Sequence, residues 1–456
     1  MRDLRYLFSI FSDIETNSFL VFFLACKYRF KYFSKSDIKK YQEKKMKDIV
    51  RYAAAKSPFF KKYYSGCNLN DIWHLPRVNK KIMMDNLGDY NTLGLDKDEI
   101  TKFYLEVEKK RDFTKRLKGI NIGMSSGTSG NRGVEIVTPR EENYMKAALL
   151  SRFDFPKGEK INLAFILRVS APAFNLDKFG HRLTYVSQLQ PLEKIMAQLA
   201  AIGPNILSGP PSMLKLIAKE VEAGRLKIAP KRLISYAEVL YPDVRDYLGK
   251  VFNCPIREIY KCTEGPIAVS CPHGSLHINE DLVVLEALKD DGSPAAPGEP
   301  CERLVVTDLH KRSQPIIRYD LNDIVTISPQ KCSCGSNFRV IERIQGRADD
   351  MFWGIRKDGS GSHFIYQDYI SRAIISTSEA IDDYQAIQED YCHVVLRIKT
   401  KIAGQNDLAS NLVGAVRGVF SSYGCQEPEV KVVFGDPLRN EFSNKLARII
   451  CKIKNQ

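Results

Sequence analysis

The sequence predicts an α/β protein: a large N-terminal domain of mainly parallel, helix-covered sheets plus a distorted barrel segment, and a small C-terminal α+β domain. The chain has 456 residues, which exceeds the size of one ordinary domain. It contains 44% hydrophobic and 27% charged residues, which is typical of a globular protein with a sizeable core. Between residues 161 and 260, apolar runs alternate with amphipathic segments, and this alternation predicts parallel strands connected by helices.

The N-terminal part is predicted to be mainly helical. Apolar residues recur every three to four positions among lysines in residues 36–64, and Ser57-Pro58 is expected to stop or kink this helix. Short helical and loop segments follow as far as about residue 118. A further helix is expected to begin at Pro139, with Glu141 and Glu142 in its first turn.

The alternating region is expected to form the central sheet. Strands are predicted at residues 161–167, 205–208, 232–236 and 257–260, and helices at 192–202, 212–223 and 242–252. Beyond Gly265, shorter strands at 282–288 and 304–308 are separated by Pro/Gly turns, which predicts the antiparallel or distorted barrel segment. The charged stretch at residues 347–350 marks the domain boundary. We therefore expect domains at 1–348 and 349–456, with residues 1–65 as a basic helical cap.

Positive charge is concentrated at the N-terminus. The net charge is +14, and residues 1–65 hold 15 lysines and arginines against six acidic residues, with aromatic residues interleaved at 27–33. This pattern is compatible with an anionic membrane surface or nucleic acid. The alternative, which we prefer, is a solvated basic cap whose aromatic side chains pack on the rest of the protein. We expect no nucleic-acid partner, and a peripheral membrane contact stays open.

Other sequence features favour a reduced, cytoplasmic protein. The apolar run at residues 19–26 is too short to span a bilayer, and no small-residue cleavage site follows it. The cytoplasm is therefore the expected compartment. The 11 cysteines are irregularly spaced, which does not suggest a disulfide framework, so we expect mainly reduced thiols.

A loop rich in glycine and hydroxyl residues lies between two strand-like runs, 120–124 and 134–138. It consists of Ser125, Ser126, Gly127, Thr128, Ser129 and Gly130, followed by Asn131, Arg132 and Gly133. Glycines allow backbone N–H groups to approach an anion, and the hydroxyls add rotatable donors, so the loop suits a phosphate. A polar hairpin turn is the alternative interpretation.

Four further motifs add chemistry. Thr263 and Glu264 follow Tyr260 at the carboxyl end of a predicted parallel strand, where open α/β sheets bind ligands. A hydroxyl beside a carboxylate there could hold a phosphate and its Mg²⁺, although a Thr-Glu pair also begins many helices. The remaining motifs contain Asp323 after an apolar strand, Arg347 after a glycine, and Lys445 in the segment FSNKLAR.

In this order and spacing, the five motifs resemble those of the adenylate-forming superfamily of acyl-CoA synthetases, adenylation domains and luciferases. The chain looks most like the phenylacetate-CoA ligase branch, especially its clade of adenylate-forming enzymes related to the deazaflavin-coenzyme adenylating synthetases. The closer match lies in the phrases LPRVNKKIMMDNLGDYNTLGL, SSGTSGNRG, ISYAEVL, YKCTEG, LHINED, QPIIRYDLNDI and CSCG. The resemblance covers nearly the whole chain.

The resemblance implies a role for each motif residue. Residues 125–130 would bind the β- and γ-phosphates of ATP. Glu238 would lie beside the adenine and acyl pockets, and Tyr260 would stack on adenine. Thr263 would contact the phosphates, Glu264 would bind Mg²⁺, and Asp323 and Arg347 would bind the ribose. Asp349 would be the hinge of a mobile C-terminal lid, and Lys445 would contact the α-phosphate and the acyl oxygens. The acyl pocket is expected to include residues 164–173 and 265–270, together with Tyr236 and Ala237.

The implied activity is ATP- and Mg²⁺-dependent activation of a small carboxylic acid as an acyl-adenylate, followed by transfer to coenzyme A or a carrier-protein thiol. One alternative is adenylation coupled to amide or ester formation or to AMP transfer. Another is a catalytically lapsed membrane-peripheral binding protein.

Two departures from the family pattern matter. Asn131-Arg132 stands where a lysine and a proline are usual, and residues 359–364 replace the usual glycine-rich lid hairpin. Arg132 could substitute for the lysine, but a guanidinium is not equivalent to an ammonium.

Four potential metal ligands occur in two closely spaced pairs. Cys271 and His277 belong to CPHGSLH, and Cys332 and Cys334 belong to KCSCGS. Soft and borderline ligands of this kind fit a closed tetrahedral zinc site of structural type. His273 could replace His277, and four unrelated residues are the alternative.

Overall fold

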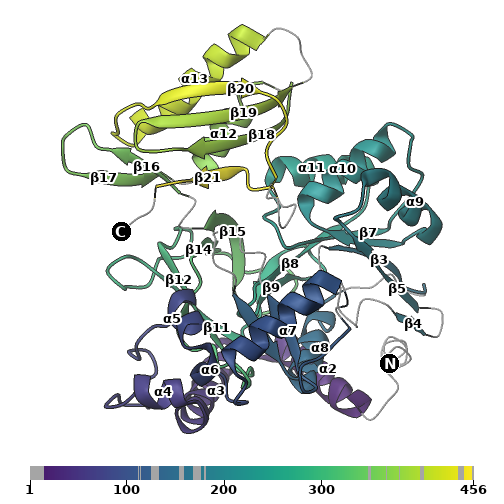
Figure 1. Cartoon of the computed structure of the whole chain (residues 1–456), viewed down its shortest axis with the longest axis vertical. Coiled ribbons are helices and arrows are strands. Elements are labelled where there is room, and N and C mark those ends of the chain that lie inside the picture. The colour runs from purple at the N-terminus through teal and green to yellow at the C-terminus, as the bar shows by residue number, and fades with distance from the viewer. Residues whose placement is uncertain are drawn as a thin grey trace. The chain divides into compact units, whose positions relative to one another are not determined.

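The computed structural model of the whole chain contains two compact units (Figure 1). It describes residues 15–110, 112, 114–124, 133–153, 159–167, 176–178, 181–347, 351–365, 367–378, 380–400, 405–439 and 446–453. The first unit contains residues 1–321 and 326–343, and the second contains 322–325 and 344–456. No helix among the described residues is both long enough and apolar enough to cross a membrane.

The first unit begins with helices that are separated by side-chain caps. Ser34 and Asp37 form a capping box at the start of α3, and the hydroxyl of Ser57 accepts from the N–H of Phe60 at the start of α4. Ser57-Pro58 therefore ends one helix and begins the next, as predicted. The helices of this part are α2 (Glu15–Tyr32), α3 (Lys35–Lys56), α4 (Pro58–Tyr63), α5 (Lys80–Asp85), α6 (Leu87–Tyr90), α7 (Lys97–Lys110) and α8 (Pro139–Leu150).

A ten-stranded sheet forms the centre of the fold, in the order β14-β15-β10-β9-β8-β7-β6-β3-β5-β4. The strands from β5 to β8 in this order pair in parallel. Its strands are β3 (Asn162–Leu167), β4 (Leu176–Lys178), β5 (His181–Ser187), β6 (Ile206–Gly209), β7 (Arg232–Tyr236), β8 (Ile256–Lys261), β9 (Pro266–Ser270), β10 (Leu276–Ile278), β14 (Asp323–Ile327) and β15 (Val340–Arg347).

Three helices cover one face of the parallel strands: α9 (Leu192–Ile202), α10 (Pro211–Glu222) and α11 (Pro242–Phe252). Ala164 and Ile166 of β3 join the core cluster formed with these helices. Leu163 and Phe165 of the same strand belong to a separate cluster. Because side chains alternate along a strand, the two clusters lie on opposite faces of the sheet. The strand at 232–236 and the helices at 192–202 and 242–252 have the predicted bounds.

Antiparallel strands surround this parallel centre. A hairpin of β1 (Asn121–Met124) and β2 (Val134–Val137) pairs Met124 with Val134. A three-stranded sheet joins β11 (Val283–Leu288), β12 (Arg303–Asp308) and β13 (Tyr319–Asp320). This antiparallel sheet occupies the predicted barrel segment.

The second unit has its own apolar core. A four-stranded sheet in the order β20-β19-β18-β21 shares a core cluster with α12 and α13, and β16 and β17 form a hairpin. The bounds are β16 (Phe352–Ile355), β17 (Ser362–Ile365), α12 (Gln367–Ile375), β18 (Ile381–Gln388), β19 (His393–Thr400), α13 (Gln405–Ser422), β20 (Glu429–Phe434) and β21 (Ile449–Cys451). The predicted α/β fold class is confirmed. The boundary at 348/349 and the mobility of the lid stay predictions.

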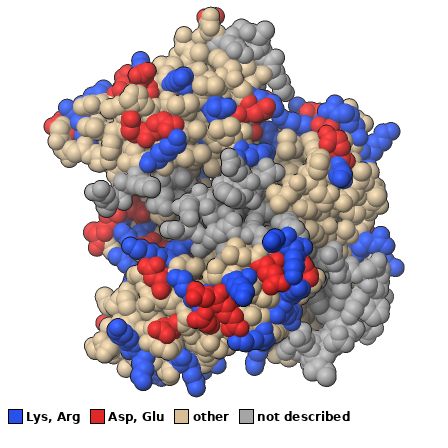
Figure 2. All heavy atoms as spheres, viewed as in Figure 1, with Lys and Arg blue, Asp and Glu red and all other residues tan. Residues whose placement is uncertain are grey.

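Charged side chains of both signs are interspersed on the face drawn in Figure 2. In the basic N-terminal segment, Arg29 is paired with the buried Asp281, and the ring of Phe30 packs against His277 and Phe338. Part of the segment therefore packs on the rest of the first unit. Tyr28 and Tyr32, in contrast, are about three-fifths exposed, at 59% and 60%.

Candidate active site and metal centre

The expected phosphate loop lies outside the described residues, but the hairpin that contains it is described. Residues 125–132 connect Met124 of β1 to Gly133, which directly precedes β2. Lys445 and Asp349 also lie outside the described residues. Their proposed roles therefore rest on the sequence.

The segment that contains Tyr260, Thr263 and Glu264 connects β8 to β9. Tyr260 is half-buried near the carboxyl end of β8, which pairs in parallel with β7. The following residues form a tight connection, in which the N–H of Cys262 donates to the carbonyl of Gly265 at 3.1 Å. Thr263 and Glu264 are thus in a turn between strands, and they do not begin a helix. This turn lies at the edge where a parallel sheet binds ligands.

The carboxylate of Glu264 is buried near two tyrosines. Glu264 has a relative exposure of 9%, and Tyr90 and Tyr319 are almost fully buried. Burial raises the pKa of Tyr319, and the Glu264 carboxylate raises it further. Burial, Tyr64 and Glu264 likewise raise the pKa of Tyr90. Both phenols consequently remain protonated around Glu264 at neutral pH.

Glu238 is hydrogen-bonded to the start of a helix. Its two carboxylate oxygens accept from the backbone N–H and the hydroxyl of Ser212, each at 3.1 Å, in the first turn of α10. A carboxylate at a helix N-terminus is stabilised by the helix dipole. The preceding Ala237 has φ 71°, a left-handed conformation that directs the chain away from the end of β7. Tyr236, with its ring 5.8 Å from that of Phe165, lies at the same end of the sheet.

Two lysines that were not assigned to the site from the sequence, the half-buried Lys261 and the buried Lys311, lie beside the Thr263 turn. The ammonium of Lys261 is 3.2 Å from both carboxylate oxygens of Glu135 in β2. The ammonium of Lys311 lies 3.9 Å from Glu135 Oε1 and donates to the carbonyl of Thr263 at 3.2 Å. The sequence features that could have indicated this ion pair are Lys261 within YKCTEG and Glu135, the acidic residue of the apolar strand VEIV.

Asp308 is a buried carboxyl group at the end of β12. It accepts from the N–H groups of His310 at 2.8 Å and Lys311 at 2.9 Å. Burial raises its pKa from 3.8 to about 6, although these N–H groups and the Lys311 charge oppose the rise. A Cβ at position 265 would lie 3.2 Å from Asp308 Oδ2, so the glycine permits the close approach of the Thr263 turn.

Asp323 and Arg347 belong to the second unit. Asp323 is half-buried at the first position of β14, after Asn322 with φ 60°, and Arg347 is the last residue of β15. Gly346 precedes it with φ 113°, and a side chain there would clash with Gln367. The glycine of this motif thus allows β15 to pass α12.

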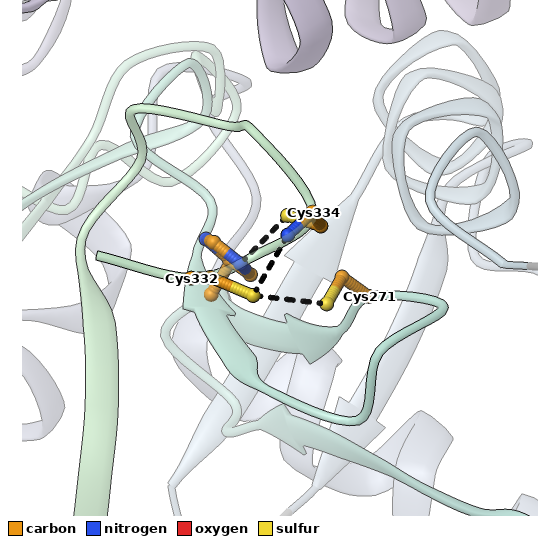
Figure 3. A group of neighbouring side chains, drawn as sticks. Cys271, Cys332 and Cys334 are labelled. Carbon is orange, nitrogen blue, oxygen red and sulfur yellow. Dashed lines mark hydrogen bonds between the residues drawn. The ribbon is translucent and has the colours of Figure 1, made fainter. Parts of the chain in front are cut away.

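The four expected metal ligands come together in the structure (Figure 3). Their ligand atoms all lie within 4.8 Å of one another, and the sulfurs of Cys271, Cys332 and Cys334 point toward one small space. The Sγ atoms of Cys271 and Cys332 are 3.7 Å apart, and Cys334 Sγ is 3.4 Å from His277 Nε2. Zinc–sulfur bonds of about 2.3 Å in a tetrahedron place two sulfurs roughly 3.8 Å apart, so this spacing fits zinc.

Surrounding contacts orient the histidine for metal binding. His277 Nδ1 lies 2.8 Å from the carbonyl of Phe338, which selects the tautomer that leaves Nε2 available as a ligand. His273, the alternative ligand, contacts the hydroxyl of Ser333 at the surface and is not in the cluster. The loop that contains Cys332 and Cys334 also contacts α2, because Ser336 Oγ donates a hydrogen bond to the carbonyl of Phe30 at 2.7 Å.

Comparisons with known proteins give a consistent picture. No family model matches the chain. It is 23% identical over 378 residues to Protein CapK of Staphylococcus aureus, covering 79% of this chain and 78% of that one. It is 21% identical over 374 residues to the phenylacetate-coenzyme A ligase of Thermus thermophilus, covering 76% and 77%. These sequence similarities support a ligase enzyme.

The fold has clear counterparts among solved structures. A 2-hydroxyisobutyryl-CoA ligase with 2-HIB-AMP, in its postadenylation state, matches with a TM-score of 0.70 and 15% identity, covering 93% of this chain and 91% of that one. An anthranilate CoA ligase with anthranoyl-AMP matches with a TM-score of 0.50 and 14% identity, covering 72% and 66%. The predicted resemblance to adenylate-forming ligases is therefore confirmed at the level of the fold and of sequence similarity.

Proposed function

We propose that this chain, which has the fold of the adenylate-forming ligases and is similar in sequence to phenylacetate-coenzyme A ligases, activates a carboxylic acid with ATP. The products would be an acyl-adenylate and pyrophosphate, and the acyl group would pass to coenzyme A or another thiol. The observation that carries the proposal is the placement of Thr263 and Glu264 in the turn after β8, at the carboxyl edge of the parallel sheet.

The chemistry requires charge neutralisation and positioning more than a proton acceptor. The acid is already ionised at neutral pH, so its carboxylate can attack the α-phosphorus without a general base. We assign phosphate contact to Thr263 and the loop at 125–130, and contact with the α-phosphate and acyl oxygens to Lys445. Such contacts stabilise the charge that develops during phosphoryl transfer.

The resemblance also suggests which residues contact the rest of the nucleotide. We assign adenine stacking to Tyr260 and ribose binding to Asp323 and Arg347, with Asp349 as the hinge of a mobile lid. The carboxylate of Glu238 is already hydrogen-bonded to Ser212. We therefore propose that Glu238 forms part of the pocket wall and does not hydrogen-bond directly to the acid.

Magnesium would bind at Glu264. Its carboxylate is buried beside two protonated tyrosines, and Mg²⁺ typically takes one or two carboxylates together with phosphate oxygens. Bound there, the ion supplies Lewis-acid charge to the phosphates. The residues of the chain fix the position of the carboxylate that receives it.

We also propose that Cys271, His277, Cys332 and Cys334 bind a structural zinc ion. Four protein ligands complete a tetrahedron and leave no open coordination position, which argues against a catalytic metal. The second coordination shell is also present, through the Phe338 carbonyl.

A peripheral membrane contact through α2 is a separate proposal. Val21, Leu24, Tyr28 and Tyr32 are exposed along this helix, with Lys27 and Lys31 beside them. Apolar and basic side chains on the exposed face of one helix suit an anionic lipid surface. Pelleting with phosphatidylserine vesicles tests it: replacing Leu24, Tyr28 and Tyr32 with serine should abolish binding, and vesicle binding that persists would contradict it.

Product analysis tests the proposed reaction and its acceptor. The protein would be incubated with MgATP and a panel of compact and aromatic acids, with and without coenzyme A, and the products identified by mass spectrometry. Acyl-CoA that forms only with coenzyme A supports the thiol acceptor. An amide, an ester or an AMP-modified product would replace that part of the proposal, and ATP left intact with every acid would contradict adenylation.

A further inference from the structure

A half-buried ammonium group lies next to the turn proposed to bind nucleotide. Lys261 follows Tyr260 at the end of β8, and its side chain has a relative exposure of 15%. Its Nζ atom contacts both oxygens of the Glu135 carboxylate at 3.2 Å and the carbonyl of Cys262 at 3.3 Å. Thr263 is two residues away in the chain. The ammonium is therefore held beside the Thr263 turn.

One carboxylate is shared between two ammonium groups at this place. Lys311, with a side-chain exposure of 7%, has its Nζ 3.9 Å from Glu135 Oε1 and 3.2 Å from the carbonyl of Thr263. A single carboxylate cannot neutralise two lysines, and burying a charge is costly unless the charge is paired. The acidic neighbours of these two ammonium groups are Glu135 and Asp308, whose carboxyl group also interacts with the Lys311 charge.

The position of Glu135 connects this group to the phosphate loop. Glu135 pairs with Gly123 in the β1–β2 hairpin, and the residues that join these strands include the loop at 125–130. The ion pair thus links the base of the loop hairpin to the end of β8. Burial alone would lower the pKa of Lys261, but Glu135 and Tyr236 raise it, so the net pKa lies above the ordinary value and the group is charged at neutral pH.

We propose that Lys261 binds a phosphate oxygen of ATP and supplies, from β8, the ammonium that the loop itself lacks. Asn131-Arg132 stands in the loop where a lysine is usual, and a lysine side chain on a neighbouring strand offers the same point charge on a flexible stem. Glu135 positions this ammonium in the absence of nucleotide. The inference rests on the proposed function, because it requires the site to bind ATP.

Titration calorimetry with MgATP tests this role on the full-length protein. Lys261→Met should weaken MgATP binding by about tenfold or more, the loss expected for one charge-assisted hydrogen bond. Glu135→Gln removes the competing partner but retains the ammonium, so affinity should stay within about twofold of wild type or become tighter. Arg245→Met is the matched control, because it breaks the ion pair with Glu258 on the same strand and should leave affinity unchanged.

Unfolding temperatures measured on the same variants separate binding from structure. If Lys261→Met and Glu135→Gln weaken MgATP binding equally, or neither changes it, the ion pair only tethers the hairpin and the inference is overturned. Should Lys261→Met not fold, Lys261→Gln has the same expected loss of affinity and the same power to overturn the inference. Failure of the wild type to bind MgATP would instead reject the proposed function and, with it, this inference.

Discussion

His277 Nε2 and Cys334 Sγ lie 3.4 Å apart, in contact between the two halves of the proposed zinc site. The other ring nitrogen of His277 is hydrogen-bonded to Phe338, and the Phe30 ring of α2 packs edge-on against the same imidazole at 5.2 Å between centroids. The proposed metal ligands and the docked end of α2 are therefore parts of one contact network.

Metal removal should consequently loosen α2. We expect about one zinc per chain in the purified protein, as for other closed sites with four protein ligands. Chelation, or Cys334→Ser, should increase amide hydrogen exchange near Phe30, because the loop that holds this helix loses its crosslink. Cys67→Ser, outside the cluster, is the control and should change neither zinc content nor exchange. Protein without zinc and with unchanged exchange in Cys334→Ser would contradict the assignment.

The buried pair of Arg152 and Asp281 should be important for stability. The Arg152 side chain is fully buried, and its guanidinium forms an ion pair with Asp281. Asp281 also forms an ion pair with Arg29. Arg152→Met should lower the free energy of unfolding by about 3–5 kcal/mol, because it leaves a buried charge with fewer partners. Arg225→Met, which removes the exposed pair with Glu220, should cost about 0–1 kcal/mol. Equal costs in urea unfolding would contradict this ranking.

Asp308 should make stability depend on pH in a defined direction. Its pKa is raised from 3.8 to about 6 in the folded protein, so the unfolded chain releases this proton first as pH rises. The Asp308 contribution to stability is complete below pH 3.8 and is lost as pH rises toward 6. At about 1.4 kcal/mol per pKa unit, the loss is roughly 3 kcal/mol.

Comparison with Asp308→Asn isolates this effect, since asparagine can still accept from the two N–H groups. The unfolding free energy of wild type minus that of the variant should fall between pH 4 and pH 6.5 and then stay level. A difference that is constant across this range would show that Asp308 keeps its ordinary pKa.

Lys445 should affect the chemical step more than nucleotide binding. Lys445→Ala is expected to lower the rate of adenylation by about 100-fold or more, the size typical of removing one group that stabilises developing charge. The dissociation constant for MgATP should change little. Lys452→Ala, which removes an exposed ion pair with Glu389, is the control. Adenylation at the wild-type rate in Lys445→Ala would exclude this lysine from the site.

The sequence predicted the elements whose signals are local. The helix Leu192–Ile202 and the strand Arg232–Tyr236 have the expected bounds, because apolar periodicity and flanking Pro or Gly residues define them directly. The Cys/His cluster was also predictable, because two short ligand pairs of suitable chemistry are visible in the sequence, and the structure brings them together.

Contacts between distant segments could not be predicted in the same way. Glu135 and Lys261 are 126 positions apart, and neither residue type signals a partner, so their ion pair depends on tertiary structure that brings the two side chains together. The burial of Asp281 between two arginines depends likewise on α2, which contains Arg29, and on the residues directly after α8, which include Arg152. Thr263 and Glu264 could have begun a helix by local propensity, but the return of the chain as β9 places them in a turn.

Acid-dependent exchange of labelled pyrophosphate into ATP tests the central claim most directly. With MgATP and the acid panel, wild type should catalyse exchange with one class of acid. Glu264→Gln should reduce it about 100-fold, because one charge that holds Mg²⁺ is lost. Exchange by Glu264→Gln at the wild-type rate would contradict the account. So would the absence of exchange with every acid when the wild-type protein is shown to bind MgATP.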